Sequence, residues 1–251
     1  MSLTKLFILA AVSFLTSLVS VITGSTSLVT VPVMIEFGID PHVAVATNMM
    51  ALIFMSLGGS LPFAQKGVLS LRFLPLALVL TVVGSALGAL LLLRVPVRTL
   101  QLVIAVAMIV VALFSFLRKD SGVSAHSVSN FRRAAGYSST FVLAVYGGFF
   151  SGGYVTMLTA VFVVLFGLTL LQSVATTKIV NICSSTIATL IFAWRGVVDY
   201  RLGVILGATM FLGAIIGAHA TMRISSTWLR RIFLLAVAGL AAKMLFGFLR
   251  Y

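Results

Sequence analysis

Long apolar runs alternate with short polar breaks along the whole chain. The runs cover residues 3–22, 26–37, 42–63, 70–93, 98–117, 135–151, 154–167, 170–194, 201–222 and 228–250. Most are close to the ~20 residues that an α-helix needs to cross a bilayer. The runs at 26–37 and 154–167 are shorter, and the first would rise only about 18 Å as a helix. The pattern predicts an all-α polytopic membrane protein with two segments too short to span the bilayer.

Each short run follows a break that is rich in glycine and hydroxyl groups. The first break reads Gly24-Ser25-Thr26-Ser27, and the second reads Ser151-Gly152-Gly153-Tyr154. Backbone that leaves the helix at membrane depth is tolerated only where protein or a water-filled cavity surrounds it. We therefore expect two short broken or re-entrant helices, beginning at Thr26 and Tyr154 near the bilayer midplane.

The second half of the chain repeats the first at a constant offset. Gly24 and Gly153, Gly38 and Gly167, and Gly84 and Gly213 are each 129 positions apart, and the same offset aligns Val45-Ala46-Thr47 with Val174-Ala175-Thr176. A repeat that preserves glycine and polar positions as well as apolar ones indicates two related structural units. We assign residues 1–117 and 134–251 to two membrane repeats and residues 118–133 to a basic linker.

Each repeat holds about five segments, which is an odd number. The second repeat is therefore predicted to have the opposite topology, a known construction of transporters. Basic residues in short loops favour the cytoplasm. The side of the linker holds nine of them, namely Lys66, Arg72, Arg118, Lys119, Arg132, Arg133, Arg223, Arg230 and Arg231. The opposite side holds six, namely Lys5, Arg94, Arg98, Arg195, Arg201 and Arg250. We expect a multi-pass protein of the inner cell membrane with a cytoplasmic linker and both termini outside.

Composition agrees with this class and excludes others. The chain of 251 residues is 61% hydrophobic and 8% charged, whereas a soluble domain is about 25% charged. The single cysteine, Cys183, excludes an intramolecular disulfide. With 17 basic and 4 acidic residues the net charge is +13, but the basic residues lie mostly at the ends of apolar runs, so we expect the lipid bilayer and no nucleic acid as a partner.

The motifs of enzymes are absent from the sequence. It contains no cluster of His, Cys and acidic residues spaced for a metal, no Walker loop and no GxSxG elbow. We expect no enzymatic activity, no cofactor and no metal. Pairs with GxxxG spacing, such as Gly84 and Gly88, indicate close helix packing within the chain or between subunits, which leaves a homodimer open.

Lys178 is the residue that most directly indicates chemistry. It lies seven or eight residues into an apolar run, or about 10–12 Å along a helix. A lysine near the bilayer centre costs at least about 2.5–3.5 kcal/mol, so such residues usually face a polar interior. The structural alternatives are snorkelling to the surface and a structural ion pair, but the same run contains no acid. Asn181, at i+3, lies on the same helix face.

Other polar groups are expected around the same point. The inverted repeat would bring Thr47 and Asn48 close to Lys178, together with two helix N-termini, whose free N–H groups and positive dipole ends suit an anion. The predicted substrate site is Gly24, Ser25, Thr26, Thr47, Asn48, Gly152, Gly153, Tyr154, Thr176, Thr177, Lys178 and Asn181. Glu36 is a candidate for a coupling proton, although it could equally be the solvated end of a short helix.

These motifs resemble the sulfite exporter family TauE/SafE. The resemblance rests on Gly24, Val31-Pro32, Gly38 and Ala46-Thr47-Asn48 in the first half, and on Gly152-Gly153, Gly167, Ala175-Thr176-Thr177-Lys178, Asn181 and Gly196-Val197-Val198-Asp199 in the second. The resemblance covers nearly the whole chain. It implies export of a small sulfur-containing anion, such as sulfite or the organosulfonate sulfoacetate.

The leading hypothesis is an anion transporter that works by alternating access around Lys178. A passive anion channel with the same fold is the first alternative, and a permease for another small anion is the second. A cation-coupled importer is weakened by the scarcity of acids within the membrane, and a membrane scaffold by the two broken helices.

Overall fold

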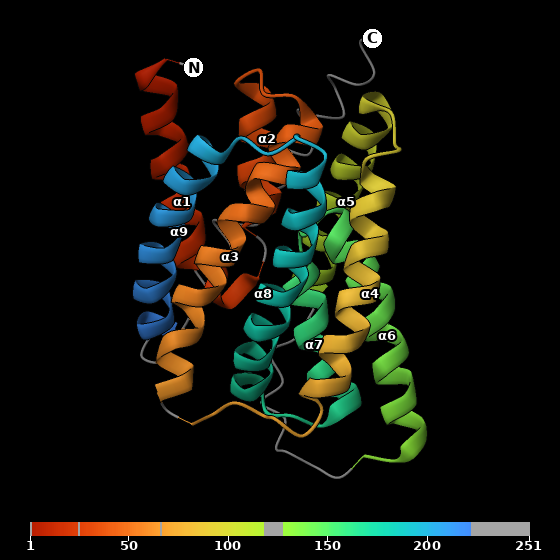
Figure 1. The fold of residues 1–251 in the computed structure, drawn as a ribbon. Helices are drawn as coiled ribbons and strands as arrows, with labels where there is room; N and C mark the ends of the chain where they lie inside the picture. Colours follow the sequence, from red (N-terminus) through yellow and green to blue (C-terminus); the bar gives the residue numbers. More distant parts are fainter. Residues whose placement is uncertain (1, 25, 66, 118–127, 222–251) are drawn as a thin grey trace.

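The computed structural model of the chain describes residues 2–24, 26–65, 67–117 and 128–221 (Figure 1). This part of the chain is all-α, as predicted. Its helices are α1 (Leu3–Thr23), α2 (Ser27–Glu36), α3 (Pro41–Gln65), α4 (Leu74–Leu92), α5 (Val97–Leu117), α6 (Asn130–Phe149), α7 (Tyr154–Phe166), α8 (Leu170–Trp194) and α9 (Tyr200–Thr221). Each of the first nine apolar runs of the sequence therefore corresponds to one helix, and the run at 228–250 lies outside the described residues.

Five of the described helices are long and apolar enough to cross a membrane, namely α1, α3, α4, α8 and α9. The predicted short helices α2 and α7 have only 10 and 13 residues. Helix α6 begins at Asn130, earlier than its apolar run, because the Ser129 side chain accepts a hydrogen bond from the Arg132 backbone N–H and caps it. The end of the expected linker is thus helical, while residues 118–127 lie outside the described part.

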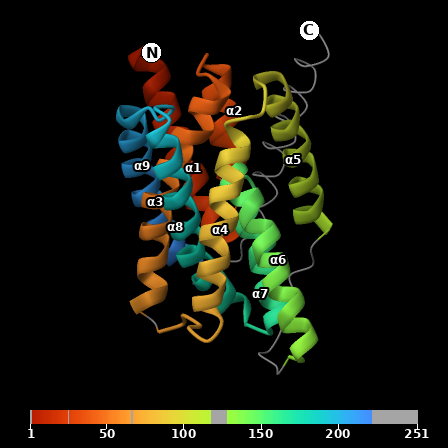
Figure 2. The ribbon, with the colours of Figure 1, turned by 45° about the vertical axis from the view of Figure 1, so that its right-hand side comes forward.

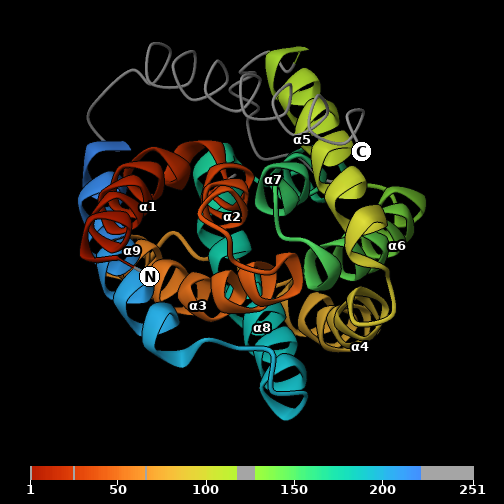
Figure 3. The ribbon, with the colours of Figure 1, turned by 90° about the horizontal axis from the view of Figure 1, so that it is seen from above.

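The helices run roughly along one long axis, and the two short ones occupy opposite halves of it. In Figures 1 and 2, α2 lies towards the upper end of the molecule and α7 towards the lower end. Seen from above, α2 and α7 are neighbours near the middle of the bundle, with α3 and α8 beside them (Figure 3). The break before each short helix therefore lies inside the bundle, where protein surrounds the non-helical backbone.

Helices of the two halves pack on each other in a reciprocal way. Helix α4 contacts α6, and α9 contacts α1. Only glycine permits these two approaches. A Cβ placed on Gly88 would clash with the Val145 carbonyl oxygen of α6, and one on Gly217 would clash with the Leu18 carbonyl oxygen of α1. In the described part of the chain, the predicted GxxxG pairs serve internal packing.

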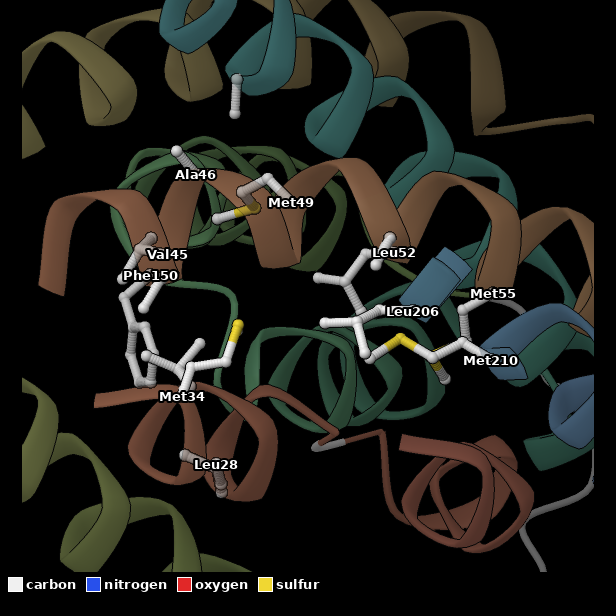
Figure 4. Close-up of a cluster of buried hydrophobic side chains, with 14 of the residues drawn as sticks. Leu28, Met34, Val45, Ala46, Met49, Leu52, Met55, Phe150, Leu206 and Met210 are labelled. Atoms are coloured by element: carbon white, nitrogen blue, oxygen red, sulfur yellow. The ribbon is translucent and has the colours of Figure 1, made fainter. Parts of the chain in front are cut away.

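Apolar side chains from both halves form the interior. Figure 4 shows Leu28 and Met34 of α2, Val45 of α3 and Phe150, which precedes the second break, in one buried cluster. A second cluster surrounds the end of α7, where the Phe166 ring lies 4.9 Å from the Phe73 ring between centroids. These two clusters hold the short helices in place, because α2 and α7 contribute side chains to the first and second cluster respectively.

Backbone conformation follows the sequence repeat. The six described glycines with positive φ fall into three pairs, each 129 positions apart: Gly24 and Gly153, Gly38 and Gly167, and Gly67 and Gly196. Side-chain contacts follow the same offset, because Thr30 bonds to Asn48 at 2.7 Å while Thr159 lies 3.3 Å from Thr177. These features share the offset of the sequence repeat, and the division into two membrane repeats stays a prediction.

Polar contacts at the helix ends show which loops lie together. The Arg72 and Arg133 guanidinium groups both lie over the Phe73 ring, at 5.3 and 5.8 Å, so the α3–α4 loop and the start of α6 share one end. At the other end, the Lys5 ammonium donates to the Phe37 carbonyl oxygen. This grouping matches the two sides of the predicted loop charges, and the orientation of those sides in the membrane stays a prediction.

Candidate functional site

The two glycine breaks meet inside the bundle. Gly24 ends α1 with φ of +70°, and Gly153 begins α7 with φ of +80°, a left-handed conformation that glycine adopts without steric cost. A Cβ on Gly24 would lie 2.8 Å from the Thr156 backbone nitrogen in the first turn of α7. The end of α1 therefore abuts the N-terminus of α7, as expected from the repeat.

The N-termini of α2 and α7, like that of α4, lack the side-chain caps that some other helices have. Helices α1, α6 and α8 begin with side-chain caps from Ser2, Ser129 and Thr169 respectively. Neither Thr26 before α2 nor Gly153 before α7 makes a side-chain cap. Since an uncapped N-terminus retains its attraction for negative charge, the two breaks bring two anion-attracting helix ends into the interior.

A small cavity lies where the breaks meet α3 and α8. It is lined by Ser20, Gly24, Thr26, Ser27, Leu52, Met55, Ser151, Val155, Lys178 and Asn181. Its volume of about 10 Å³ is close to the lower limit for holding one water molecule. The cavity would have to widen to admit an oxyanion.

Lys178 is almost completely buried at the edge of this cavity, with 1% of its surface exposed. Its aliphatic stem runs past Gly59 of α3, where an added Cβ would lie 3.6 Å from Cε. Among the described residues, no carboxylate and no hydrogen-bond acceptor pairs with its ammonium. Snorkelling is excluded by its burial, so the site combines an unbalanced lysine with two positive helix ends.

The described acids all lie at helix ends and away from the cavity. Asp40 accepts hydrogen bonds from the His42 and Val43 backbone N–H groups before α3, and Asp199 accepts one from the Leu202 N–H at the start of α9. Glu36 is an exposed residue at the end of α2 and does not line the cavity. Its suggested role in proton coupling stays untested.

Polar side chains around the cavity are only partly paired. The Asn181 amide nitrogen donates to the Ser56 hydroxyl of α3 at 2.7 Å, while its carbonyl oxygen has no partner. The Thr26 hydroxyl donates to the Ser20 hydroxyl at 2.5 Å and lies 3.2 Å from the Met55 sulfur. The cavity therefore offers hydroxyl groups, an amide carbonyl and a lysine within one small volume.

Two predicted site residues of the first half serve the packing of the protein. Asn48 uses both ends of its amide on α2: it donates to the Ser27 hydroxyl at 2.8 Å and accepts from the Thr30 hydroxyl at 2.7 Å. The Thr47 hydroxyl accepts a hydrogen bond from the Asp199 backbone N–H. Neither residue lines the cavity.

Of the predicted site, the structure brings Gly24, Thr26, Lys178 and Asn181 together at the cavity. The residues that are buried nearby without lining it are Asn48, Thr47, Gly152, Gly153, Tyr154, Thr176 and Thr177, and Ser25 lies outside the described residues. Gly152 is held by its carbonyl oxygen, which accepts a hydrogen bond from the Tyr146 hydroxyl at 2.6 Å.

Several residues that line the cavity are not among those predicted from the sequence, namely Ser20, Leu52, Met55 and Val155. Ser20 could have been found, because it lies one helical turn before the Gly24 break on a helix expected to end there. Met55 could not have been predicted from the repeat, because its counterpart, Ser184, is a different kind of residue and does not line the cavity.

Comparison with known proteins places this chain in a described family. The family model "Sulfite exporter TauE/SafE" matches residues 9–244. Among curated proteins, the chain is 29% identical to "Probable membrane transporter protein ORF9" of Sinorhizobium sp, over 93% of this chain and 89% of the relative. It is 27% identical to a "Probable membrane transporter protein" of Haemophilus influenzae, over 96% and 94%. It is also 27% identical to "Probable membrane transporter protein YfcA" of Escherichia coli, over 95% and 89%. No solved structure matches the chain.

Proposed function

Because the chain belongs to the sulfite exporter TauE/SafE family and is therefore a multi-pass membrane transporter and not an enzyme, we propose that it exports a small sulfur-containing anion. The substrate class we propose is sulfite or an organosulfonate such as sulfoacetate. The anion binds where the two glycine breaks meet, with Lys178 as its counter-charge. Access to this point alternates between the two sides of the inner cell membrane.

The observation that carries the proposal is the buried, unbalanced charge of Lys178. A buried cation without a partner is strongly unfavourable, whereas one that is paired and hydrogen-bonded can be tolerated. The described acids lie at helix ends, so a bound anion is the partner that the surroundings of Lys178 lack. The uncapped N-termini of α2 and α7 favour the same sign of charge, and the hydroxyl groups of Ser20 and Thr26 suit oxyanion oxygens.

Two features favour a carrier over an open channel. The cavity holds about one water molecule, which is too little for a hydrated anion to pass in this conformation. The short helices α2 and α7 extend towards opposite ends of the molecule from a shared central point (Figure 1). An inverted pair of repeats that rock against each other around such a point is the usual basis of alternating access.

The proposal is tested by Lys178→Met in proteoliposomes. Methionine has a similar length without charge, and Met49 occupies the corresponding position of the first half. Hydrogen bonds to charged groups contribute roughly 1.5–3 kcal/mol, so apparent affinity for the anion should fall about 10- to 150-fold. Lys5→Met is the matched control, since it removes an exposed lysine in the first turn of α1.

Flux is measured across a panel of sulfite, sulfoacetate, sulfate and acetate, with and without a pH gradient. Unchanged flux in folded Lys178→Met protein would overturn the role of Lys178. Acceleration of labelled-anion uptake by unlabelled anion on the opposite side is expected for a carrier, and its absence together with single-channel currents would instead favour the channel.

A further inference from the structure

Helix α8 concentrates the unpaired polar atoms of the interior. Seven buried side-chain oxygen atoms of the described residues lack a hydrogen-bond partner, and five of them belong to α8. These five are Ser173, Thr176, Asn181, Ser185 and Thr189. Unpaired buried polar atoms are rare in native proteins, so such a concentration on one helix requires an explanation.

Four hydroxyl groups of α8 behave unlike most of those within the other described helices. A serine or threonine within a helix usually donates to a carbonyl of the preceding turn. Thr16, Thr81 and Thr140 do so in α1, α4 and α6, at 2.7–2.8 Å. On α8, Thr177 follows this rule by donating to the Val174 carbonyl oxygen, whereas the other four hydroxyl groups named above do not. Their hydrogen atoms are therefore available to another acceptor.

Five polar positions of α8 form a row that winds by about 160° around the helix, because four residues exceed one turn of 3.6 residues. Ser173, Thr177, Asn181, Ser185 and Thr189 follow one another at intervals of four residues. The row rises about 24 Å, most of the ~30 Å thickness of the hydrocarbon core. It passes through the central cavity at Asn181, with Lys178 beside it.

The corresponding positions of α3 are either apolar or paired. At the repeat offset, Ser173 and Asn181 correspond to Ala44 and Leu52. The remaining three correspond to polar residues with partners: Thr47 accepts from the Asp199 N–H, Ser56 accepts from Asn181, and Ser60 donates to the Leu57 carbonyl oxygen at 2.9 Å. The two helices occupy equivalent places in the repeat, but the polar groups at these positions are paired on α3 and unpaired on α8.

We propose that α8 is the helix along which the transported anion moves, with Ser173 on one side of the cavity and Ser185 and Thr189 on the other. Their hydroxyl groups donate in turn to the oxyanion oxygens as the path opens on either side. This inference rests on the proposed anion transport and adds the residues of the path. Helix α3 is the structural counterpart: it contributes Leu52 and Met55 to the cavity but no unpaired polar group to the path.

Cysteine accessibility tests this inference with matched pairs. In a Cys183→Ser background, Ser173→Cys is compared with Ala44→Cys, and Thr189→Cys with Ser60→Cys. The purified protein in nanodiscs is treated with a negatively charged methanethiosulfonate that carries a sulfonate group. A buried thiol reacts only in the fraction of time in which it is exposed, so the α8 thiols should react at least about tenfold faster than their α3 counterparts. Added sulfoacetate should slow the reaction of the α8 thiols with the reagent.

Thiols of α3 that react as fast as those of α8 would overturn the inference, as would α8 labelling that sulfoacetate leaves unchanged. If a variant near the cavity fails to fold, the Thr189 and Ser60 pair, which lies farther along both helices, decides alone. Labelling is read without transport, so the two proposals fail separately. If the α8 thiols react faster than the α3 thiols and sulfoacetate protects them, but no flux is measured, only the proposed carrier function is contradicted. If flux is normal but the α8 and α3 thiols react equally fast, only the proposed path is contradicted.

Discussion

At the scale of single residues, the environment of Lys178 is unusual because three sources of positive potential converge there. The ammonium is buried, and the uncapped N-termini of α2 and α7 each contribute the equivalent of about half a positive charge. In a low-dielectric interior these charges repel each other more strongly than they would in water. We therefore expect an anion bound at the proposed site to relieve all three interactions together.

The two buried asparagines are predicted to differ in their roles. Asn48→Ala would leave the Ser27 and Thr30 hydroxyl groups without their partners, which should cost about 1–3 kcal/mol of stability for each unsatisfied group. We expect a lower melting temperature and an unchanged apparent affinity for the anion. Asn181→Ala should show the opposite pattern, because one end of its amide is unpaired beside the cavity. Thermal unfolding in detergent and flux assays measure both, and equal effects of the two variants on affinity would contradict the distinction.

Sequence reasoning could not separate these two residues. Both amides lie in apolar runs, and each has hydroxyl groups nearby in sequence. What differs is the partner, since Asn48 bonds to α2 at both ends of its amide whereas Asn181 bonds to α3 at one end only. Such pairings depend on how helices rotate against each other. Lys178 could be recognised from the sequence alone because its charge is costly at that depth whatever its neighbours are.

At the scale of helices, the apolar pattern predicted the elements well because the bilayer allows few alternatives. Backbone hydrogen bonds must be satisfied within each segment, so an apolar run of sufficient length becomes a helix. The boundary of α6 was less accurate, since the Ser129 cap and the charged residues Arg132 and Arg133 extend the helix beyond its apolar part. Hydropathy reports where lipid or protein surrounds a helix, and it does not report where the helix stops.

The break between α1 and α2 is predicted to depend on glycine for two reasons. Gly24→Ala would place a Cβ in the left-handed conformation, which costs about 1–2 kcal/mol. The same Cβ would lie 2.8 Å from the Thr156 backbone nitrogen, which cannot move aside easily. We expect loss of flux together with a marked drop in melting temperature.

Gly38→Ala is the control for this prediction. Its φ of +89° imposes comparable backbone strain, but a Cβ there would meet nothing within 4 Å. Its melting temperature should fall modestly while flux is retained. Full activity in Gly24→Ala protein would show that the breaks do not need to touch, and equal losses in both variants would attribute the effect to strain alone.

At the scale of the whole molecule, the two halves are interlocked. Helix α4 of the first half packs on α6 of the second, and α9 of the second packs on α1 of the first. Both contacts are made through glycines that occupy equivalent positions of the repeat, Gly88 and Gly217. Neither half can therefore bury its glycine surface alone, and a relative motion of the halves has to slide or tilt along both contacts together.

This arrangement also defines which loops must share a side of the membrane. The Phe73 ring contacts Arg72, Arg133 and the Phe166 ring, so the α3–α4 loop, the start of α6 and the end of α7 lie at one end. Helix α8 begins at this end, four residues after Phe166, and the row of polar residues along it therefore starts there with Ser173. The other end holds the α4–α5 loop and the loop after α8.

The excess of basic residues predicts that the end with Arg72 faces the cytoplasm. In intact cells with a Cys183→Ser background, a membrane-impermeant maleimide should label Arg94→Cys and Arg195→Cys but leave Arg72→Cys and Arg132→Cys unlabelled until the cells are permeabilised. All four side chains are exposed, so access to the reagent and not burial decides the result. Labelling of the Arg72 and Arg132 variants from outside would reverse the orientation. Under the predicted orientation, an exported anion would meet Ser173 first and leave past Thr189.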